Sequence, residues 1–128
     1  MGNFKIDHVA IWAEDLELLR EFYAKYFGGV SGPLYHNPAK GFTSYFISFD
    51  GGCRLELMHR EGMTKGKDNQ LGYAHISFSV GSKEKVNELT ERIRNAGFSI
   101  LGEPRTTGDG YYESVIADPE GNIIEITE

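Results

Sequence analysis

Two histidines and two glutamates occupy equivalent places in a repeated sequence pattern. His8 lies in a predicted strand near the start of the chain, and His75 lies in a similar strand 67 residues later. Glu56 and Glu125 lie in two further predicted strands, 69 residues apart. Two neutral imidazoles and two carboxylates balance the charge of one divalent cation. If a pseudo-twofold axis relates the halves, all four side chains can meet around one ion such as Zn, Ni, Co, Mn or Fe.

The first half of the chain contains the pattern strand, helix, strands. The predicted helix is capped by Asp15, repeats its apolar residues at helical spacing and ends at Gly28-Gly29. Strands are expected on either side of it, and Asp50-Gly51-Gly52 is a hairpin turn signal. The expected strands are 4–12, a short strand within 30–35 broken at Gly32-Pro33, 42–49 and 53–59.

The second half repeats this order. Ser82 is the expected cap of a helix whose apolar face holds Val86, Leu89, Ile93 and Ala96, and Gly97 is expected to stop it. The expected strands are 73–80, 98–102, 111–117 and 122–127. Each half is therefore predicted to be a β-α-β-β-β module (repeats of about 4–60 and 73–127), joined by the polar connector 61–72, in one domain of the α+β class.

Alternation along the strands predicts where the four candidates point. Side chains of a strand alternate between its two faces, so Val9 and Ile11 face the helix while His8 shares the other face with Ala10 and Trp12. In each strand that holds a candidate, the helix-facing side is aliphatic and the candidate lies opposite. Two interpretations stay open for Trp12, Tyr45, Tyr111 and Tyr112, which form either an apolar wall beside the candidates or ordinary core packing. Likewise, Arg60, Lys65, Lys67 and Arg105 either meet an anionic cofactor or are solvated surface charges. The remaining histidines, His36 and His59, are interpreted as surface residues.

Composition sets limits on function. The chain has 128 residues, 40% of them apolar, which is enough for one domain with its own core. The net charge of −6 gives no basic face for nucleic acid. No apolar run approaches membrane length, and Cys53 is the single cysteine, so no intrachain disulfide is expected. We therefore expect a cytoplasmic protein that acts on a small molecule and binds neither nucleic acid nor membrane.

At the four candidate positions the sequence resembles the vicinal oxygen chelate (VOC) superfamily, specifically its glyoxalase I-like (lactoylglutathione lyase) branch. The segments that carry this resemblance are IDHVAIW (6–12), RLELM (54–58), YAHISFSV (73–80) and DPEGNIIEIT (118–127). The resemblance implies two tandem βαβββ modules, one divalent metal per site (Ni, Co or Zn), and the metal ligands His8, Glu56, His75 and Glu125. It also implies a homodimer, with each site formed within one chain or across two.

The resemblance further implies the chemistry. Glyoxalase I acts on the hemithioacetal of a 2-oxoaldehyde and a thiol, with the metal as Lewis acid stabilising a cis-enediolate. A glutamate ligand takes the C1 proton and assists its return at C2, and by position Glu125 is the expected base with Glu56 as its counterpart. The sequence departs from glutathione-using members at two positions: Trp12 replaces an arginine and Arg60 replaces an asparagine. These changes put glutathione in doubt and indicate another low-molecular-weight thiol.

Other members of the same superfamily suggest alternatives. A thiol transferase of the fosfomycin-resistance kind uses three ligands, so Glu56 argues against it, although GDGYY at 108–112 is similar to that branch. An extradiol dioxygenase typically has a much longer chain. A metal-free protein that sequesters a drug such as bleomycin has this fold without the ligand set. Bound metal therefore separates an enzyme from a sequestering protein.

Overall fold

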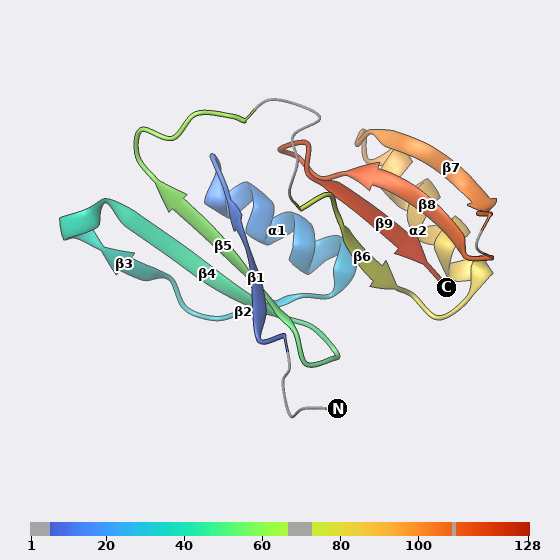
Figure 1. Ribbon diagram of the computed structural model, residues 1–128, viewed down its shortest axis with the longest axis horizontal. Helices are drawn as coiled ribbons and strands as arrows, with labels where there is room; N and C mark the ends of the chain where they lie inside the picture. The colour runs from blue at the N-terminus through green and yellow to red at the C-terminus, as the bar shows by residue number, and fades with distance from the viewer. Residues whose placement is uncertain (1–5, 67–72, 109) are drawn as a thin grey trace. The chain divides into compact units, whose positions relative to one another are not determined.

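The computed structural model describes residues 6–66, 73–108 and 110–128 (Figure 1). The chain divides into two compact units, Met1–Gly66 and Lys67–Glu128. Each unit contains one α-helix and one sheet, so the predicted α+β fold of two βαβββ-like modules is confirmed. The division falls within the expected connector 61–72, and residues 67–72 of that connector lie outside the described residues.

The helix of the first unit begins and ends where the sequence predicts. Helix α1 (Leu16–Phe27) is capped by Asp15, whose Oδ1 accepts a hydrogen bond from the Leu18 amide at 3.0 Å. It ends at Gly28, whose φ of 67° is a left-handed conformation that glycine adopts without a steric penalty. The helix residues that are buried are Leu19, Phe22, Tyr23 and Tyr26.

The sheet of the first unit places its first strand beside its last. Its order is β1-β5-β4-β2, with β3 paired to β4, and β1 runs parallel to β5. Helix α1 covers one face, toward which Leu55, Leu57 and Ile47 are buried (Figure 1). The strands are β1 (His8–Trp12), β2 (Val30–Ser31), β3 (Tyr35–Asn37), β4 (Phe42–Ser48) and β5 (Arg54–Arg60), and a 3-10 turn, η1 (Pro38–Lys40), joins β3 to β4.

The second unit repeats the parallel pairing of first and last strands. Its sheet has the order β6-β9-β8-β7, with β6 parallel to β9. Helix α2 (Lys83–Asn95) is capped by Ser82, as predicted, and packs Val86 and Ile93 against the sheet. The strands are β6 (Ile76–Ser79), β7 (Ile100–Thr106), β8 (Tyr112–Ala117) and β9 (Ile123–Thr127).

Two details of the second unit differ from the prediction. Strand β6 begins at Ile76, so His75 lies directly before the strand, because pairing with β9 starts at Ile76 and Ile124. The buried stripe of α2 contains Thr90, whereas Leu89 is half-buried and Ala96 is exposed. Thr90 is tolerated there because its Oγ1 donates to the Val86 carbonyl at 2.6 Å and accepts from a second hydroxyl in the core.

Within the described residues, none of the helices combines the length and the apolar character needed to span a bilayer. The described part of the first strand begins at His8, and the portion of the predicted strand 4–12 that covers residues 4 and 5 lies outside the described residues.

Candidate metal centre

The parallel pairing in the first unit brings His8 to Glu56. Glu56 on β5 pairs with Ala10 on β1, and His8 lies two residues before Ala10, on the same face. The His8 Nε2 atom is 3.6 Å from Glu56 Oε1. Both side chains lie on the sheet face that points away from α1, which we call the helix-distal face of the first unit. The predicted orientation of His8, opposite Val9 and Ile11, agrees with this pairing.

The second unit repeats this arrangement. Glu125 on β9 pairs with Ser77 on β6, and His75 lies two residues before Ser77. The His75 Nε2 atom is 3.2 Å from Glu125 Oε1. In both units, the residue that pairs with the glutamate lies two positions after the histidine: Ala10 in the first unit and Ser77 in the second. The two His–Glu pairs are therefore equivalent in strand register as well as in spacing along the chain.

Both distances suit two ligands of one metal ion. Nitrogen and carboxylate oxygen donors lie about 2.1 Å from such an ion, so two donors are roughly 3.0 Å apart at a right angle and roughly 3.4 Å apart in a tetrahedral site. The observed 3.6 Å and 3.2 Å separations lie close to this range. The side chains of Glu56 and Glu125 are 15% and 24% exposed, and each histidine side chain is 39% exposed. The carboxylates are therefore mostly covered, whereas the imidazoles are accessible to solvent. The donor set fits a divalent cation.

The structure brings the four predicted ligands together as two pairs, one in each unit. Across residues 6–66, 73–108 and 110–128, no group of three or more His, Cys, Asp or Glu side chains is arranged to hold a metal ion. The meeting of both pairs around one cation therefore stays a prediction.

Asp7 and Arg54 surround His8 on the side away from Glu56. Asp7 Oδ2 lies 2.7 Å from His8 Nδ1 and 2.8 Å from Arg54 Nη2. The hydrogen bond with His8, followed by that from Arg54, holds the pKa of the Asp7 carboxyl below its ordinary value. A neutral His8 that donates from Nδ1 to Asp7 has its Nε2 lone pair available for a metal ion, as in carboxylate–histidine–metal arrangements.

Neither Asp7 nor Arg54 was predicted to support His8. Asp7 has a local signal, because it directly precedes His8. Arg54 has none, because it meets His8 only through the parallel register of β1 and β5, which joins residues 46 positions apart. Arg54 also lies over the Phe46 ring, 4.3 Å from its centroid, and His8 contacts the same ring edge-on at 5.3 Å.

The structure contradicts part of the predicted aromatic wall and leaves the rest a prediction. Trp12 lies on the helix-distal face, and Tyr111 is exposed just before β8. The prediction was wrong for Tyr45 and Tyr112, which lie on the helix-facing sides of their sheets. The guanidinium of Arg20 from α1 lies 5.0 Å from the Tyr45 ring centroid, and the Tyr112 hydroxyl donates to Asn87 of α2 at 2.6 Å.

The remaining predicted residues lie as follows. Arg60 is exposed on the helix-distal face of the first unit, Lys65 and Arg105 are exposed, and Lys67 lies outside the described residues. His36 is exposed, as predicted. The surface interpretation of His59 was wrong: it alternates onto the helix-facing side, is half-buried, and places its Nδ1 atom 2.8 Å from the Ala13 carbonyl oxygen.

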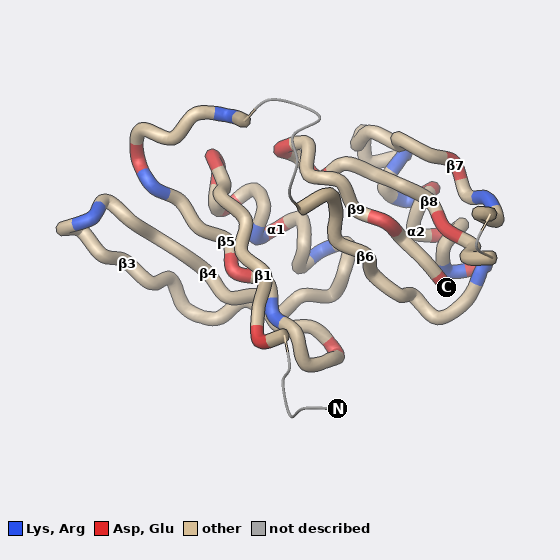
Figure 2. The backbone as a smooth tube through the Cα atoms, viewed as in Figure 1, with Lys and Arg blue, Asp and Glu red and all other residues tan. Residues whose placement is uncertain are grey.

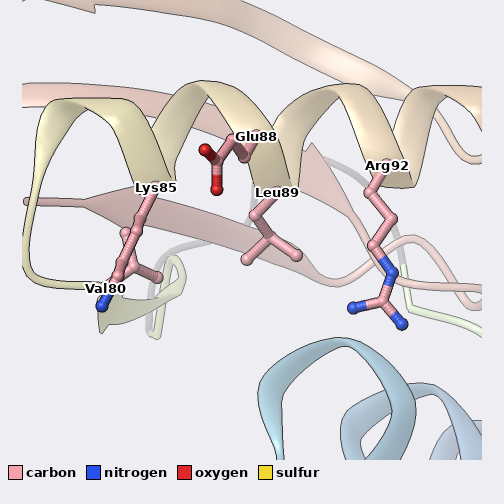
Figure 3. Close-up of a pocket in the computed structure, with 5 residues that line it drawn as sticks. All are labelled: Val80, Lys85, Glu88, Leu89 and Arg92. Atoms are coloured by element: carbon pink, nitrogen blue, oxygen red, sulfur yellow. The ribbon is translucent and has the colours of Figure 1, made fainter.

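A hollow of about 350 Å³ lies along α2, separate from the His75 and Glu125 pair. Lys85, Leu89 and Arg92 project from the same side of the helix toward it (Figure 3). Its lining consists of Val80, Lys85, Glu88, Leu89 and Arg92. The lining mixes both signs of charge with two aliphatic side chains and includes none of the predicted ligands.

Acidic and basic residues are interspersed along the chain up to Arg105, beyond which the sequence has acidic residues but no Lys or Arg. Figure 2 shows red and blue positions interspersed over strands and loops of the described chain, without a continuous basic stripe.

The chain is similar to proteins of known family and structure. Residues 5–126 match the family model described as Glyoxalase/Bleomycin resistance protein/Dioxygenase superfamily. The trypanothione-dependent glyoxalase I of Leishmania major is 25% identical with a TM-score of 0.80, over 98% of this chain and 87% of the other. A glyoxalase family protein from Enterococcus faecalis has a TM-score of 0.82 at 24% identity over the whole of both chains, which supports the fold.

A curated relative carries a different activity. The ethylmalonyl-CoA/methylmalonyl-CoA epimerase of Cereibacter sphaeroides is 29% identical over 114 residues, which cover 83% of this chain and 82% of the relative.

Proposed function

Since the chain belongs to the Glyoxalase/Bleomycin resistance protein/Dioxygenase superfamily, we propose that it is a metal-dependent lyase of the glyoxalase I kind. It converts the hemithioacetal of a 2-oxoaldehyde and a thiol into a 2-hydroxyacyl thioester. The observation that carries the proposal is the repeated pair, His8 with Glu56 and His75 with Glu125, set at the same strand offset in both units. We further propose that the protein works in the cytoplasm as a homodimer.

The four side chains hold one divalent cation, Ni, Co or Zn, either within one chain or between two chains of the dimer. Their two carboxylate charges neutralise the ion, and the separations of 3.6 Å and 3.2 Å within the pairs support this assignment. When bound, the metal supplies Lewis acidity to the carbonyl and hydroxyl oxygens of the substrate.

The protein's own task is to move one proton between adjacent carbons. Glu125 takes the proton from C1 of the hemithioacetal and returns a proton to C2, while the proton of the C1 hydroxyl passes to the C2 oxygen, so that C1 becomes the thioester carbonyl and C2 becomes the carbinol. C1 is oxidised as C2 is reduced, and the step needs no external redox partner. Glu56, on the equivalent strand of the first unit, faces the substrate as the counterpart of Glu125. The imidazoles of His8 and His75 are the two neutral ligands of the site.

The identity of the thiol cosubstrate depends on residues other than the four metal ligands. Trp12 and Arg60 stand where glutathione-using members carry an arginine and an asparagine, which favours another thiol. The Leishmania major relative, which is trypanothione-dependent, supports the view that the fold serves thiols of more than one kind.

A second candidate function is epimerisation of a 2-substituted malonyl thioester, favoured by the Cereibacter sphaeroides relative. That reaction also removes and returns a proton beside a thioester carbonyl. Two glutamates in equivalent strands provide one base for each face of the carbon, Glu56 for one and Glu125 for the other. The two candidates share the ligand set and differ in substrate.

The test begins with the metal. Protein purified without chelators is analysed for bound elements, and its melting temperature is measured with Ni, Co or Zn added. A hundredfold excess over Kd stabilises the folded state by roughly 2.7 kcal/mol, which raises the melting temperature by several degrees. His8→Ala should abolish this rise, whereas His36→Ala, a matched exposed histidine outside the pairs, should keep it. Absence of bound metal together with absence of any rise contradicts the proposal and favours a metal-free binding protein.

Activity then separates the two candidates. Methylglyoxal is mixed with each of several thiols, and thioester formation is followed by absorbance. Exchange of the C2 hydrogen of methylmalonyl-CoA into deuterated water is followed in parallel. Thioester formation with one of the thiols supports the lyase, and exchange without thioester formation replaces it with the epimerase.

A further inference from the structure

Three aromatic side chains and one arginine gather at one end of the helix-distal face of the first unit. We call this group the aromatic–arginine cluster: Trp12, Tyr35, Phe42 and Arg60. The Phe42 ring contacts the Trp12 ring edge-on, with centroids 6.2 Å apart, and contacts the Tyr35 ring at 6.0 Å. The Arg60 guanidinium lies 4.9 Å from the Trp12 ring centroid. The four residues come from four different strands, β1, β3, β4 and β5.

The cluster exposes more ring surface than the aromatic residues of the core. Trp12 is 43% exposed and Tyr35 is 54% exposed, whereas Phe22, Tyr23 and Tyr26 of α1 are buried. A group of exposed aromatic rings next to a polar rim is a common feature of ligand sites. The edge-to-face packing fixes the rings of Trp12 and Phe42 in place before any ligand arrives.

Arg60 supplies a positive charge that the described residues leave uncompensated. Among those residues, no ion pair joins Arg60 to a carboxylate, whereas Arg20, Arg54 and Arg94 are each held in one. The Arg60 guanidinium instead lies over the Trp12 ring. A guanidinium stacked on a ring keeps its edge donors available for an anion, with which it forms paired hydrogen bonds.

Strand geometry sets the distance from the cluster to the reacting end of the site. Arg60 lies four residues beyond Glu56 on β5 and on the same face, which corresponds to roughly 13 Å along the strand. Trp12 is in register with Met58, two residues from Glu56 and thus roughly 7 Å along the sheet. A substrate whose oxygens lie at His8 and Glu56 reaches the cluster only with an extended tail.

We propose that the aromatic–arginine cluster binds the tail of the thiol or thioester substrate, and that this tail carries an aromatic ring with an anionic group. The ring packs against Trp12 and Phe42, and the anion accepts hydrogen bonds from Arg60. The assignment of the other end of the ligand to His8 and Glu56 rests on the proposed function. Recognition of an aryl anion by the cluster stands on the cluster's own geometry.

Trp12 is the single tryptophan of the chain, so its fluorescence reports on this subsite directly. Three small probes separate the contributions of ring and charge: phenylacetate has both, phenylacetamide has the ring without the charge, and cyclohexylacetate has the charge without the aromatic ring. Phenylacetate should change the Trp12 emission with the lowest Kd. Phenylacetamide should bind about tenfold more weakly, since a hydrogen bond to a charged group is lost. Cyclohexylacetate should also bind more weakly than phenylacetate.

Two variants locate the effect. Arg60→Gln should raise the Kd of phenylacetate to that of phenylacetamide and leave phenylacetamide unchanged. Arg20→Gln is the matched control, because Arg20 also lies over an aromatic ring, that of Tyr45, but on the helix-facing side. It should leave all three affinities unchanged. Equal binding of phenylacetate and phenylacetamide, or an unchanged preference in Arg60→Gln, overturns the proposal.

A second copy of the chain is the competing occupant of an exposed aromatic surface. If it covers the cluster, the Trp12 emission shifts with protein concentration and the probes do not compete, and this result also overturns the proposal. The probes are tested on protein with and without added Ni, alongside the metal-dependent rise in melting temperature. If the probes do not bind but the metal still raises the melting temperature, the tail subsite is contradicted and the proposed lyase is not. If the probes bind but the metal has no effect, the subsite is supported and the proposed lyase is contradicted.

Discussion

The Nδ1 atom of His8 lies 2.7 Å from Oδ2 of Asp7, and the equivalent histidine of the second unit, His75, is preceded by Ala74. The two His–Glu pairs therefore share strand register but differ in their support. A carboxylate on Nδ1 fixes the ring orientation and increases the basicity of Nε2. In the first unit this carboxylate is itself held by Arg54.

Asp7→Ala should weaken metal binding by about 10-fold to 100-fold, the range found for partners of ligating histidines. Asp7→Asn should restore part of the affinity, because its amide oxygen still accepts from Nδ1. Affinity is measured by competition with a chelator, and Asp50→Asn, at an exposed aspartate of the same unit, is the control. An unchanged affinity in Asp7→Ala contradicts a role for Asp7 in orienting His8.

Glu125→Gln should lower kcat of the lyase reaction by about 100-fold to 10,000-fold, the range for loss of a general base. Glu56→Gln should lower kcat less, because Glu125 is the proposed base. The measurement is steady-state kinetics with methylglyoxal and the active thiol, with metal content determined for both variants. If Glu125→Gln retains full activity, the base lies elsewhere, and a larger effect from Glu56→Gln exchanges the two roles.

The hydroxyls of Thr90 and Ser114 form a buried pair 2.7 Å apart between α2 and β8. Thr90→Val should lower the free energy of unfolding by about 1–3 kcal/mol, because the Ser114 hydroxyl is then buried without its partner. Adding Ser114→Ala should cost less than the sum of the two single changes. Urea unfolding of the four proteins measures this coupling. Strictly additive effects are inconsistent with a shared hydrogen bond.

Arg94 links α2 to β7 through Glu103 and also donates to Glu91 at 3.1 Å. The hydrogen bond from Arg94 holds the pKa of Glu103 below its ordinary value of 4.5. A carboxyl with a lowered folded-state pKa stabilises the fold above its unfolded-state pKa, and this stabilisation is lost as the pH falls through the folded-state pKa. The effect is small, since both side chains are at the surface.

The melting temperature of Glu103→Gln should therefore lie below that of the parent at neutral pH and converge with it in acid below pH 4.5. Glu88→Gln, at an exposed glutamate of α2, provides the comparison for a change of net charge alone. A difference that persists undiminished into acid, or that is equal for both variants, means that the pairing with Arg94 is not its source.

The helices were predictable because their signals are local. Asp15 and Ser82 bond to amides three residues away, and Gly28 supplies a left-handed conformation, so each boundary depends on a few neighbouring residues. The buried position of Thr90 was not predictable in this way. It depends on a hydroxyl partner 24 residues distant, which periodicity of apolar residues does not detect.

The strand faces of His8, Glu56 and Glu125 were predictable from the alternation of apolar and polar residues, whereas the position of His75 just before β6 was not. The aromatic wall was not predictable either, because strand β4 carries aromatic residues on both faces and alternation alone does not say which face holds the site. Tyr45 lies on the helix side, in register with Leu57 and next to Arg20, while Phe42 and Phe46 lie opposite. The role of Arg54 depends on a parallel register between residues far apart in sequence, which no local pattern specifies.

The number of metal ions bound per chain decides whether the four side chains share one site. Calorimetric titration with Zn or Ni should give one ion per chain, and His8→Ala and His75→Ala should each abolish the same tight binding, while His36→Ala should not. Two independent ions per chain, or tight binding at one pair that survives loss of the other histidine, would contradict a single cation shared by His8, Glu56, His75 and Glu125.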